Sequence, residues 1–224
     1  FSQSYTYFTW KNTTYEIRDW MREFSDPEVL EYYRGNLFAN TPDILHEYLQ
    51  RGGRPAFRIR LVLAATLSPL YGIYSGYELY ENVPVREGSE EYLNSEKYEL
   101  RPRTYSTEDS LAPYITQINE IRQKHPALAR LTNLTFHEVD KENIICFSKT
   151  SEDDGSILVL VNLNPFHWEE GTTDLDLEAL GIEPGQPFEV HDLITDTTYV
   201  WQGPSNYVRL DPLDQPAHIF RVST

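Results

Sequence analysis

The spacing of apolar residues changes once along the 224-residue chain, near residue 131. Before this point, segments rich in β-branched and aromatic residues alternate with segments whose apolar residues recur at helical spacing. After it, short strand-like segments follow one another about every ten residues. Strand-helix alternation is typical of parallel strands, whereas closely spaced strands are typical of antiparallel sheets. We therefore expect an α/β region over 1–130 and an all-β region over 131–224.

The first region contains three strand-then-helix units. Strands are predicted at 5–10, 35–40 and 70–74. A capping box of Thr13 and Glu16 begins the first helix. Pro55 begins a later one, after a loop at 50–54, and Ser110 caps the last. Residues 77–107 show no sustained period, and an irregular connection of this length inside a compact domain is usually functional.

Three such units fit either an open doubly wound sheet or part of a (β/α)₈ barrel. The nucleotide-binding form of the open sheet has no support, because no Gly-x-Gly-x-x-Gly follows a predicted strand and no Gly-Lys-Ser is present. A barrel requires eight units and about 250 residues. The barrel reading therefore requires five more units upstream of Phe1, and a chain that begins beside a strand is expected to be cut from a longer one.

The second region predicts an antiparallel sandwich or a partly closed barrel. Its strands are expected at 134–139, 143–149, 156–163, 172–177, 187–191, 197–202, 206–210 and 217–222. Acidic charge is concentrated here: 17 acidic and 4 basic side chains, against 18 and 15 in residues 1–130.

The net charge of −16 argues against a partner that is a nucleic acid or an anionic membrane. No apolar run approaches the roughly 20 residues of a membrane span. Cys146 is the only cysteine, which rules out an intrachain disulfide and fits a reducing, cytoplasmic compartment. We expect its thiol to be buried and inert, because no basic residue adjoins it. No cofactor or metal site is predicted, since the six histidines lack ligand spacing.

Asp43 follows the second predicted strand at the end where barrel enzymes place their chemistry. The local alternative is an ordinary Pro-Asp turn in which Asp43 caps a helix over 44–49. The long loop at 77–107 leaves the same end. Its aromatic and long polar side chains suit the surface of a sugar, although a solvated acidic loop is an equal alternative. These side chains are Tyr77, Tyr80, Tyr92, Lys97 and Tyr98.

The segment 36–43, which ends in Asn40-Thr41-Pro42-Asp43, resembles the seventh-strand motif of the α-amylase superfamily, glycoside hydrolase family 13. This form of the motif is similar to that of the α-1,4-glucan:maltose-1-phosphate maltosyltransferases. Further segments of the chain extend the resemblance to all 224 residues: 50–57, 74–79, 86–92, 95–98, 100–103, 110–114 and 206–212.

The resemblance implies a retaining transferase that moves maltosyl units from α-maltose 1-phosphate to the non-reducing end of α-1,4-glucans and releases phosphate. Residues 1–130 would be the last three units of the catalytic barrel, with strands six to eight, and residues 131–224 the C-terminal β-sandwich. Asp43 matches the carboxylate that stabilises the transition state, and Lys97 and Tyr98 match the pair that holds the maltosyl group. The nucleophile and acid/base would lie upstream, so this chain alone should be inactive. The family also implies a homodimer.

Two other readings stay open. One is a carbohydrate-binding β-sandwich without catalytic activity, which would not need the motifs that lie before residue 131. The other is a related enzyme of the superfamily, such as a trehalose synthase or an amylase.

Overall fold

The first 72 residues contribute three short parallel strands. The computed structural model describes residues 4–97, 99–105, 107–152 and 155–224. The strands are β1 (Ser4–Tyr5), β2 (Gly35–Phe38) and β3 (Tyr71–Gly72), and they lie side by side in chain order. Both pairings are parallel, as the strand-helix alternation predicts. The strands are closely spaced because Gly72 leaves room for the Phe38 ring, which lies 2.5 Å from where a Cβ would stand.

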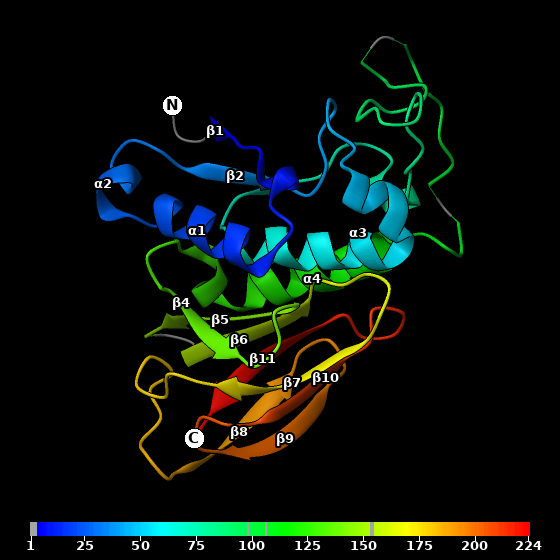
Figure 1. Cartoon of the computed structure of the whole chain (residues 1–224). Coiled ribbons are helices and arrows are strands. Elements are labelled where there is room, and N and C mark those ends of the chain that lie inside the picture. Colours follow the sequence, from blue (N-terminus) through cyan, green and yellow to red (C-terminus); the bar gives the residue numbers. More distant parts are fainter. Residues whose placement is uncertain (1–3, 98, 106, 153–154) are drawn as a thin grey trace.

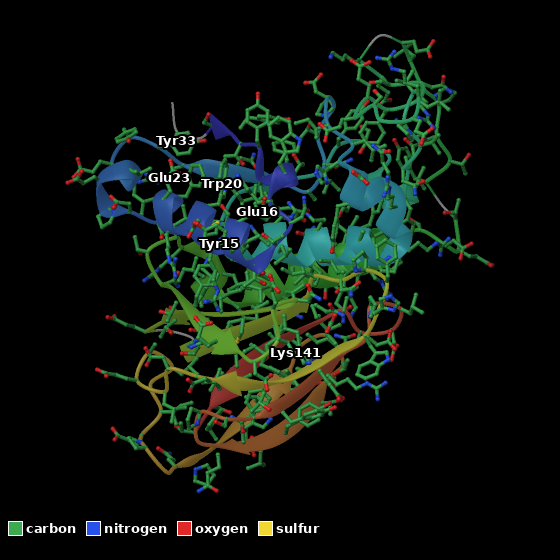
Figure 2. All side chains as sticks on the ribbon, in the orientation of Figure 1. Tyr15, Glu16, Trp20, Glu23, Tyr33 and Lys141 are labelled. Atoms are coloured by element: carbon green, nitrogen blue, oxygen red, sulfur yellow. The ribbon has the colours of Figure 1, made fainter. Side chains whose placement is uncertain are left out.

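Helices connect and cover these strands (Figure 1), and within the described ranges they comprise four α-helices and three 3₁₀ helices. They are α1 (Thr14–Phe24), α2 (Pro27–Leu30), α3 (Glu47–Leu67), α4 (Ala112–Lys124), η1 (Phe8–Trp10), η2 (Tyr77–Leu79) and η3 (Pro126–Ala129). The capping box of Thr13 and Glu16 is confirmed at the start of α1. Figure 2 shows Glu16 at this helix end, with Tyr15 and Trp20 along the helix. The predicted cap at Ser110 is wrong by one position: the N-cap of α4 is Leu111, and the Ser110 hydroxyl accepts the backbone N–H of Ala112 at 3.1 Å.

Residues 134–223 form one curled antiparallel sheet. Its strands are β4 (Leu134–Val139), β5 (Ile144–Ser151), β6 (Gly155–Asn162), β7 (Glu169–Asp174), β8 (Pro187–Asp192), β9 (Thr197–Gln202), β10 (Tyr207–Leu210) and β11 (Ala217–Ser223). Their order is β10-β7-β4-β5-β6-β11-β8-β9. In Figure 1 both ends of the sheet lie below its central strands β5, β6 and β11. The all-β prediction is therefore confirmed, with each strand close to its expected place.

Both faces of the central strands are buried, and alternate residues belong to different cores. Phe147 and Val159 pack against the helices, whereas Cys146 and Leu158 belong to a second core that is enclosed by the curl of the sheet. Strands buried on both sides read as nearly continuous apolar runs, which is the pattern of β6. The Cys146 thiol is fully buried, as expected, and burial raises its pKa.

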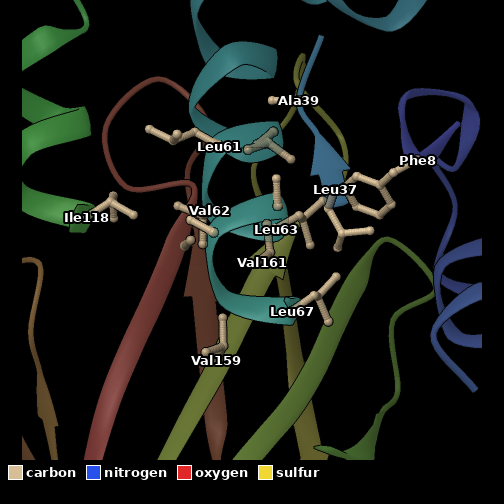
Figure 3. Packing of buried hydrophobic residues seen from close by; sticks show 14 of the residues in the cluster. Phe8, Leu37, Ala39, Leu61, Val62, Leu63, Leu67, Ile118, Val159 and Val161 are labelled. Atoms are coloured by element: carbon tan, nitrogen blue, oxygen red, sulfur yellow. The ribbon is translucent and has the colours of Figure 1, made fainter. Parts of the chain in front are cut away.

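Helix α3 lies between the two sheets and joins them into one continuous apolar core (Figure 3). Leu61, Val62 and Leu63 on three successive positions are all buried. One side of the helix contacts β2 around Leu37, and another contacts β6 around Val161. A helix that is apolar all round must be covered all round, so both sheets are needed to bury it.

The predicted strand at 5–10 is wrong over most of its length, because β1 ends at Tyr5 and η1 follows. The buried Arg60 guanidinium accounts for the difference. It donates to the carbonyl oxygens of Phe8 (2.7 Å) and Lys11 (2.5 Å) and lies 4.1 Å from the centre of the Phe8 ring. These carbonyls therefore point toward α3, and a side chain about fifty residues away overrides the local β-propensity.

The predicted loop at 50–54 is also wrong, because α3 begins at Glu47 and passes through it with a kink. His46 caps this helix through Nδ1, which accepts the backbone N–H of Tyr48 at 3.0 Å. Gly53 adopts a left-handed φ of 53°, which lets the chain turn and begin again at Pro55. The expected cap at Asp43 is therefore absent, and the cap lies three residues later.

Strand β7 begins and ends three residues before its predicted range of 172–177. The prediction followed the local alternation of residues after Thr172. The strand is instead set by pairing with β10, in which Leu210 lies opposite Glu169 and Tyr207 opposite Thr172.

In the part of the chain that the structure describes, no helix is long and apolar enough to cross a membrane.

We expect a pH dependence of stability from His137 in β4. Its Nδ1 accepts the backbone N–H of Asp176 at 3.1 Å, and its Nε2 lies 2.8 Å from the Ser148 hydroxyl. Burial lowers the pKa of His137 to about 4, from 6.5. As pH falls from 6.5 to 4 the unfolded chain binds a proton that the native chain does not, so stability should fall by up to about 3 kcal/mol.

Urea unfolding of the full-length protein between pH 7.5 and 4 measures this effect. His137→Gln keeps an amide donor and acceptor and removes the titration. It should flatten the pH dependence of the unfolding free energy, and an unchanged slope would contradict the assignment.

Candidate active site

The site is organised by Asn40, which follows β2 and is fully buried. Its Nδ2 lies 2.6 Å from the Tyr92 hydroxyl, and its Oδ1 accepts the backbone N–H of Tyr74 at 2.8 Å. A buried amide is costly unless both ends are bonded, so this position favours one arrangement of the chain. Asn40 thus joins the ends of two neighbouring parallel strands to the long loop at 77–107.

Asp43 lies at the exposed tip of the turn that Asn40 begins. The Thr41 hydroxyl accepts the backbone N–H groups of Ile44 (2.9 Å) and Asp43 (3.2 Å), which satisfies the turn internally. The Asp43 carboxylate is therefore not engaged in capping and points out of the turn, with its side chain 59% exposed. A rigid turn with an exposed carboxylate at its tip is suited to accept hydrogen bonds from a ligand.

Lys97 is 54 residues from Asp43, and the structure brings the two side chains together. The Lys97 Nζ lies 2.5 Å from the Asp43 Oδ1. The pair combines an acceptor and a three-proton donor on one surface, the combination that sugar hydroxyls require. The sequence predicted both residues for the site. Tyr98, the third predicted residue, lies outside the described residues.

The tyrosines of the long loop differ in their burial and in the residues they contact. Tyr77 is fully buried and donates its hydroxyl to the carbonyl of Phe57, so it belongs to the core and the prediction that it faces a sugar is wrong. Tyr92 is also buried and holds Asn40. Tyr80 is half-buried, with the Arg54 guanidinium 4.9 Å from its ring centre. Tyr77 therefore belongs to the core, whereas Tyr92 both holds Asn40 and forms part of a cavity wall.

Arg103 joins two segments of the long loop, one around Glu81 and one around Glu96. Its guanidinium binds the Glu81 carboxylate through Nε at 2.9 Å and Nη2 at 3.1 Å, and its Nη1 lies 2.8 Å from Glu96 Oε2. Its side chain is only 3% exposed. The contact with Arg103 lowers the pKa of Glu96. The sequence did not predict this network, because its three residues form no motif with a characteristic spacing.

A row of exposed aromatic rings lies between β1 and the loop, and it too was missed. The Tyr7 and Trp10 rings stack with centres 4.7 Å apart, and Trp10 Nε1 lies 3.1 Å from the Glu90 carboxylate. The Tyr5 ring centre lies 5.9 Å from that of Tyr7, and Thr41 and Asp43 are near the Tyr5 hydroxyl, which brings the row next to the Asp43 turn. Stacked, half-exposed rings beside a carboxylate offer the apolar and polar surfaces that a sugar ring presents.

A cavity of about 240 Å³ opens beside Lys97. Its walls are Pro42, Val85, Glu91, Tyr92, Leu93, Asn94, Ser95, Lys97 and Glu99. A neighbouring cavity of about 650 Å³ lies between the start of α3 and residues 83–90. Among the described residues, no group of three or more His, Cys, Asp or Glu side chains is arranged to hold a metal ion. The chemistry that these side chains offer is the binding of hydroxyl groups and the stabilisation of positive charge by Asp43.

Comparison with known proteins agrees with this geometry. The chain is 54% identical to alpha-1,4-glucan:maltose-1-phosphate maltosyltransferase 2 of Streptomyces coelicolor, over 99% of this chain and 33% of the relative. It is 49% identical to the maltosyltransferase of the same name from Mycobacterium tuberculosis, over 99% of this chain and 32% of the relative. The chain belongs to this maltosyltransferase family. Residues 136–222 also match the family described as "GLGE, C-terminal".

The chain spans about a third of the length of these maltosyltransferases and corresponds to their C-terminal portion. Solved structures show which fold it shares. A maltogenic α-amylase from Thermotoga neapolitana aligns with a TM-score of 0.67 at 15% identity, over 100% of this chain and 51% of that one. An Anoxybacillus α-amylase gives 0.66 at 17% identity, over 96% and 44%. The fold is therefore of the α-amylase type.

We expect Gly76→Ala to destabilise the protein and to disturb the turn that holds Glu81. Gly76 has a φ of +92°, and an added Cβ would stand 2.2 Å from Glu81 Oε2. The substitution should lower the unfolding free energy by about 1–3 kcal/mol through backbone strain and displace Glu81 as well.

Gly88→Ala in the same loop is the matched control, because its φ is +74° but nothing lies within 4 Å of the added Cβ. Thermal melts of both variants should show the larger loss for Gly76→Ala. Equal losses would mean that the contact with Glu81 contributes nothing.

Proposed function

We propose that the protein carrying this chain transfers maltosyl units from α-maltose 1-phosphate to the non-reducing end of α-1,4-glucans, with retention of configuration and release of phosphate. The pairing of Asp43 with Lys97 carries the proposal, because it places both expected sugar-binding groups at one surface. The names of the relatives supply the two substrates. In this proposal Asp43 stabilises the transition state, and Lys97 and Tyr98 hold the maltosyl group.

The reaction is a double displacement. A nucleophilic carboxylate attacks the anomeric carbon of the donor, the bond to the phosphate oxygen breaks, and inorganic phosphate leaves with the bonding electrons. The 4-hydroxyl of the acceptor then attacks the same carbon. Its proton passes to the acid/base group, and the nucleophile is released. Positive charge develops on the sugar ring in both steps, and the Asp43 carboxylate stabilises it while accepting hydrogen bonds from hydroxyls of the ring.

Asp43 is not the nucleophile in this proposal. Retaining chemistry needs two further carboxylates about 5–5.5 Å apart, and the family resemblance puts them on strands upstream of Phe1. We infer that residues 1–130 are the last three units of a (β/α)₈ barrel and that residues 131–224 are an accessory β-sandwich. Strands β1, β2 and β3 would then be the sixth, seventh and eighth barrel strands. This chain alone should release no phosphate. The resemblance further implies that the protein is cytoplasmic and forms a homodimer. Sedimentation of the full-length protein tests the homodimer.

Asp43→Asn in the full-length protein should lower kcat by roughly 10²- to 10³-fold or more, because it removes charge stabilisation that is strongest in the transition state. Phosphate release from α-maltose 1-phosphate measures the effect. The melting temperature should change little, since the side chain is exposed. Asp109→Asn, at another exposed carboxylate that pairs with an arginine, should keep near-normal turnover. Near-normal turnover of Asp43→Asn would remove Asp43 from the site.

Lys97→Ala should raise the KM for the donor more than it lowers kcat. The ammonium donates hydrogen bonds to the bound sugar in the ground state as well as in the transition state, and loss of such uniform binding appears mainly in KM. Lys124→Ala removes another exposed lysine that pairs with a carboxylate, Glu120 on α4, and its KM should match the wild type. An unchanged donor KM in Lys97→Ala would overturn the role of Lys97.

A further inference from the structure

The backbone of Lys97 is held in place by an ion-pair network that begins at the end of β3. Glu81 starts the network. Its backbone N–H donates to the carbonyl of Gly76 at 3.1 Å, and its carboxylate lies against Gly76, where no side chain larger than hydrogen fits. One carboxylate of the loop is thereby fixed to the turn that follows the third parallel strand.

Arg103 connects this fixed carboxylate to a second one. Its planar guanidinium binds Glu81 through two nitrogens and reaches Glu96 with the third, at 2.8 Å. A guanidinium keeps its charge at any relevant pH and holds its donors in a rigid fork, so it can fix two carboxylates relative to each other. With its side chain 3% exposed, this arginine is also shielded from competing water.

Glu96 is therefore anchored on several sides. Its backbone N–H donates to the Tyr74 hydroxyl at 3.0 Å, and its carboxylate forms an ion pair with Arg103 at 2.8 Å. Tyr74 is itself held by Asn40 through its backbone N–H. The residue after Glu96 is Lys97, whose ammonium lies at Asp43. The network thus ends directly beside the proposed sugar-binding group.

We propose that Arg103 is a positioning residue that acts through Glu96 to hold Lys97 in its sugar-binding place. The inference rests on the proposed function and deepens it. A lysine side chain has large rotational freedom, so ordering its backbone beforehand lowers the entropy cost that a bound sugar must meet. The network therefore tunes affinity for the donor sugar and leaves the chemical step largely unchanged.

The test is donor kinetics of the full-length protein by phosphate release. Arg103→Met should raise the KM for α-maltose 1-phosphate about tenfold and change kcat by less than about threefold. The double variant with Lys97→Ala should have the KM of Lys97→Ala alone, within about twofold, because both changes remove the same contribution. Arg103→Lys should not restore the KM, since one ammonium cannot replace a fork that spans two carboxylates.

Glu96→Gln tests the link from Arg103 to Lys97 if Arg103→Met does not fold. It leaves the pair of Arg103 with Glu81 intact and removes only the link to Lys97, so the KM should rise at least about threefold in the wild type and not further in Lys97→Ala. Arg54→Met is the matched control: it breaks another arginine-carboxylate pair near the loop, with Asp109, and should leave the KM within about twofold of the wild type.

Effects of Arg103→Met and Lys97→Ala, or of Glu96→Gln and Lys97→Ala, that multiply would overturn the inference while leaving the proposed function intact. A wild-type protein that releases no phosphate would overturn the proposed function and the inference with it.

Discussion

The buried side-chain amide of Asn40 is the constraint on which the site depends. It has no access to water, so its donor and its acceptor must both find partners within the protein. It finds them in the Tyr92 hydroxyl and the backbone of Tyr74. These two bonds join β2, β3 and the long loop, and they set where the Asp43 turn and the Lys97 segment face each other. The exposed pair that we propose to bind the sugar is thus positioned by a buried polar group.

The sequence predicted the antiparallel sheet better than the parallel one, for a physical reason. Strands such as β8 and β10 alternate exposed and buried residues, so their limits follow from local pattern. The parallel strands are only two to four residues long, and their ends are set by distant groups. Arg60 turns the chain away from β1, although 52 residues separate it from Phe8.

The candidate site shows the same difference between residues that local motifs predict and residues that meet only in the folded chain. Asp43 and Lys97 could be named in advance because short motifs carry them, and the structure brings them together. The groups that hold them could not be named, since Asn40 meets Tyr92 and Arg103 meets Glu81 only through the fold. Both sets lie before residue 131. This placement favours a site in the α/β region over the alternative in which the β-sheet alone binds carbohydrate.

In the proposed mechanism, Asp43 and Lys97 bind one sugar together. A crystal structure of the full-length protein with α-maltose 1-phosphate bound tests it most directly. The account predicts that hydroxyls of the same glucosyl unit lie within about 3.2 Å of the Asp43 carboxylate and of the Lys97 ammonium. A donor bound with neither side chain in contact with its sugar would contradict the account.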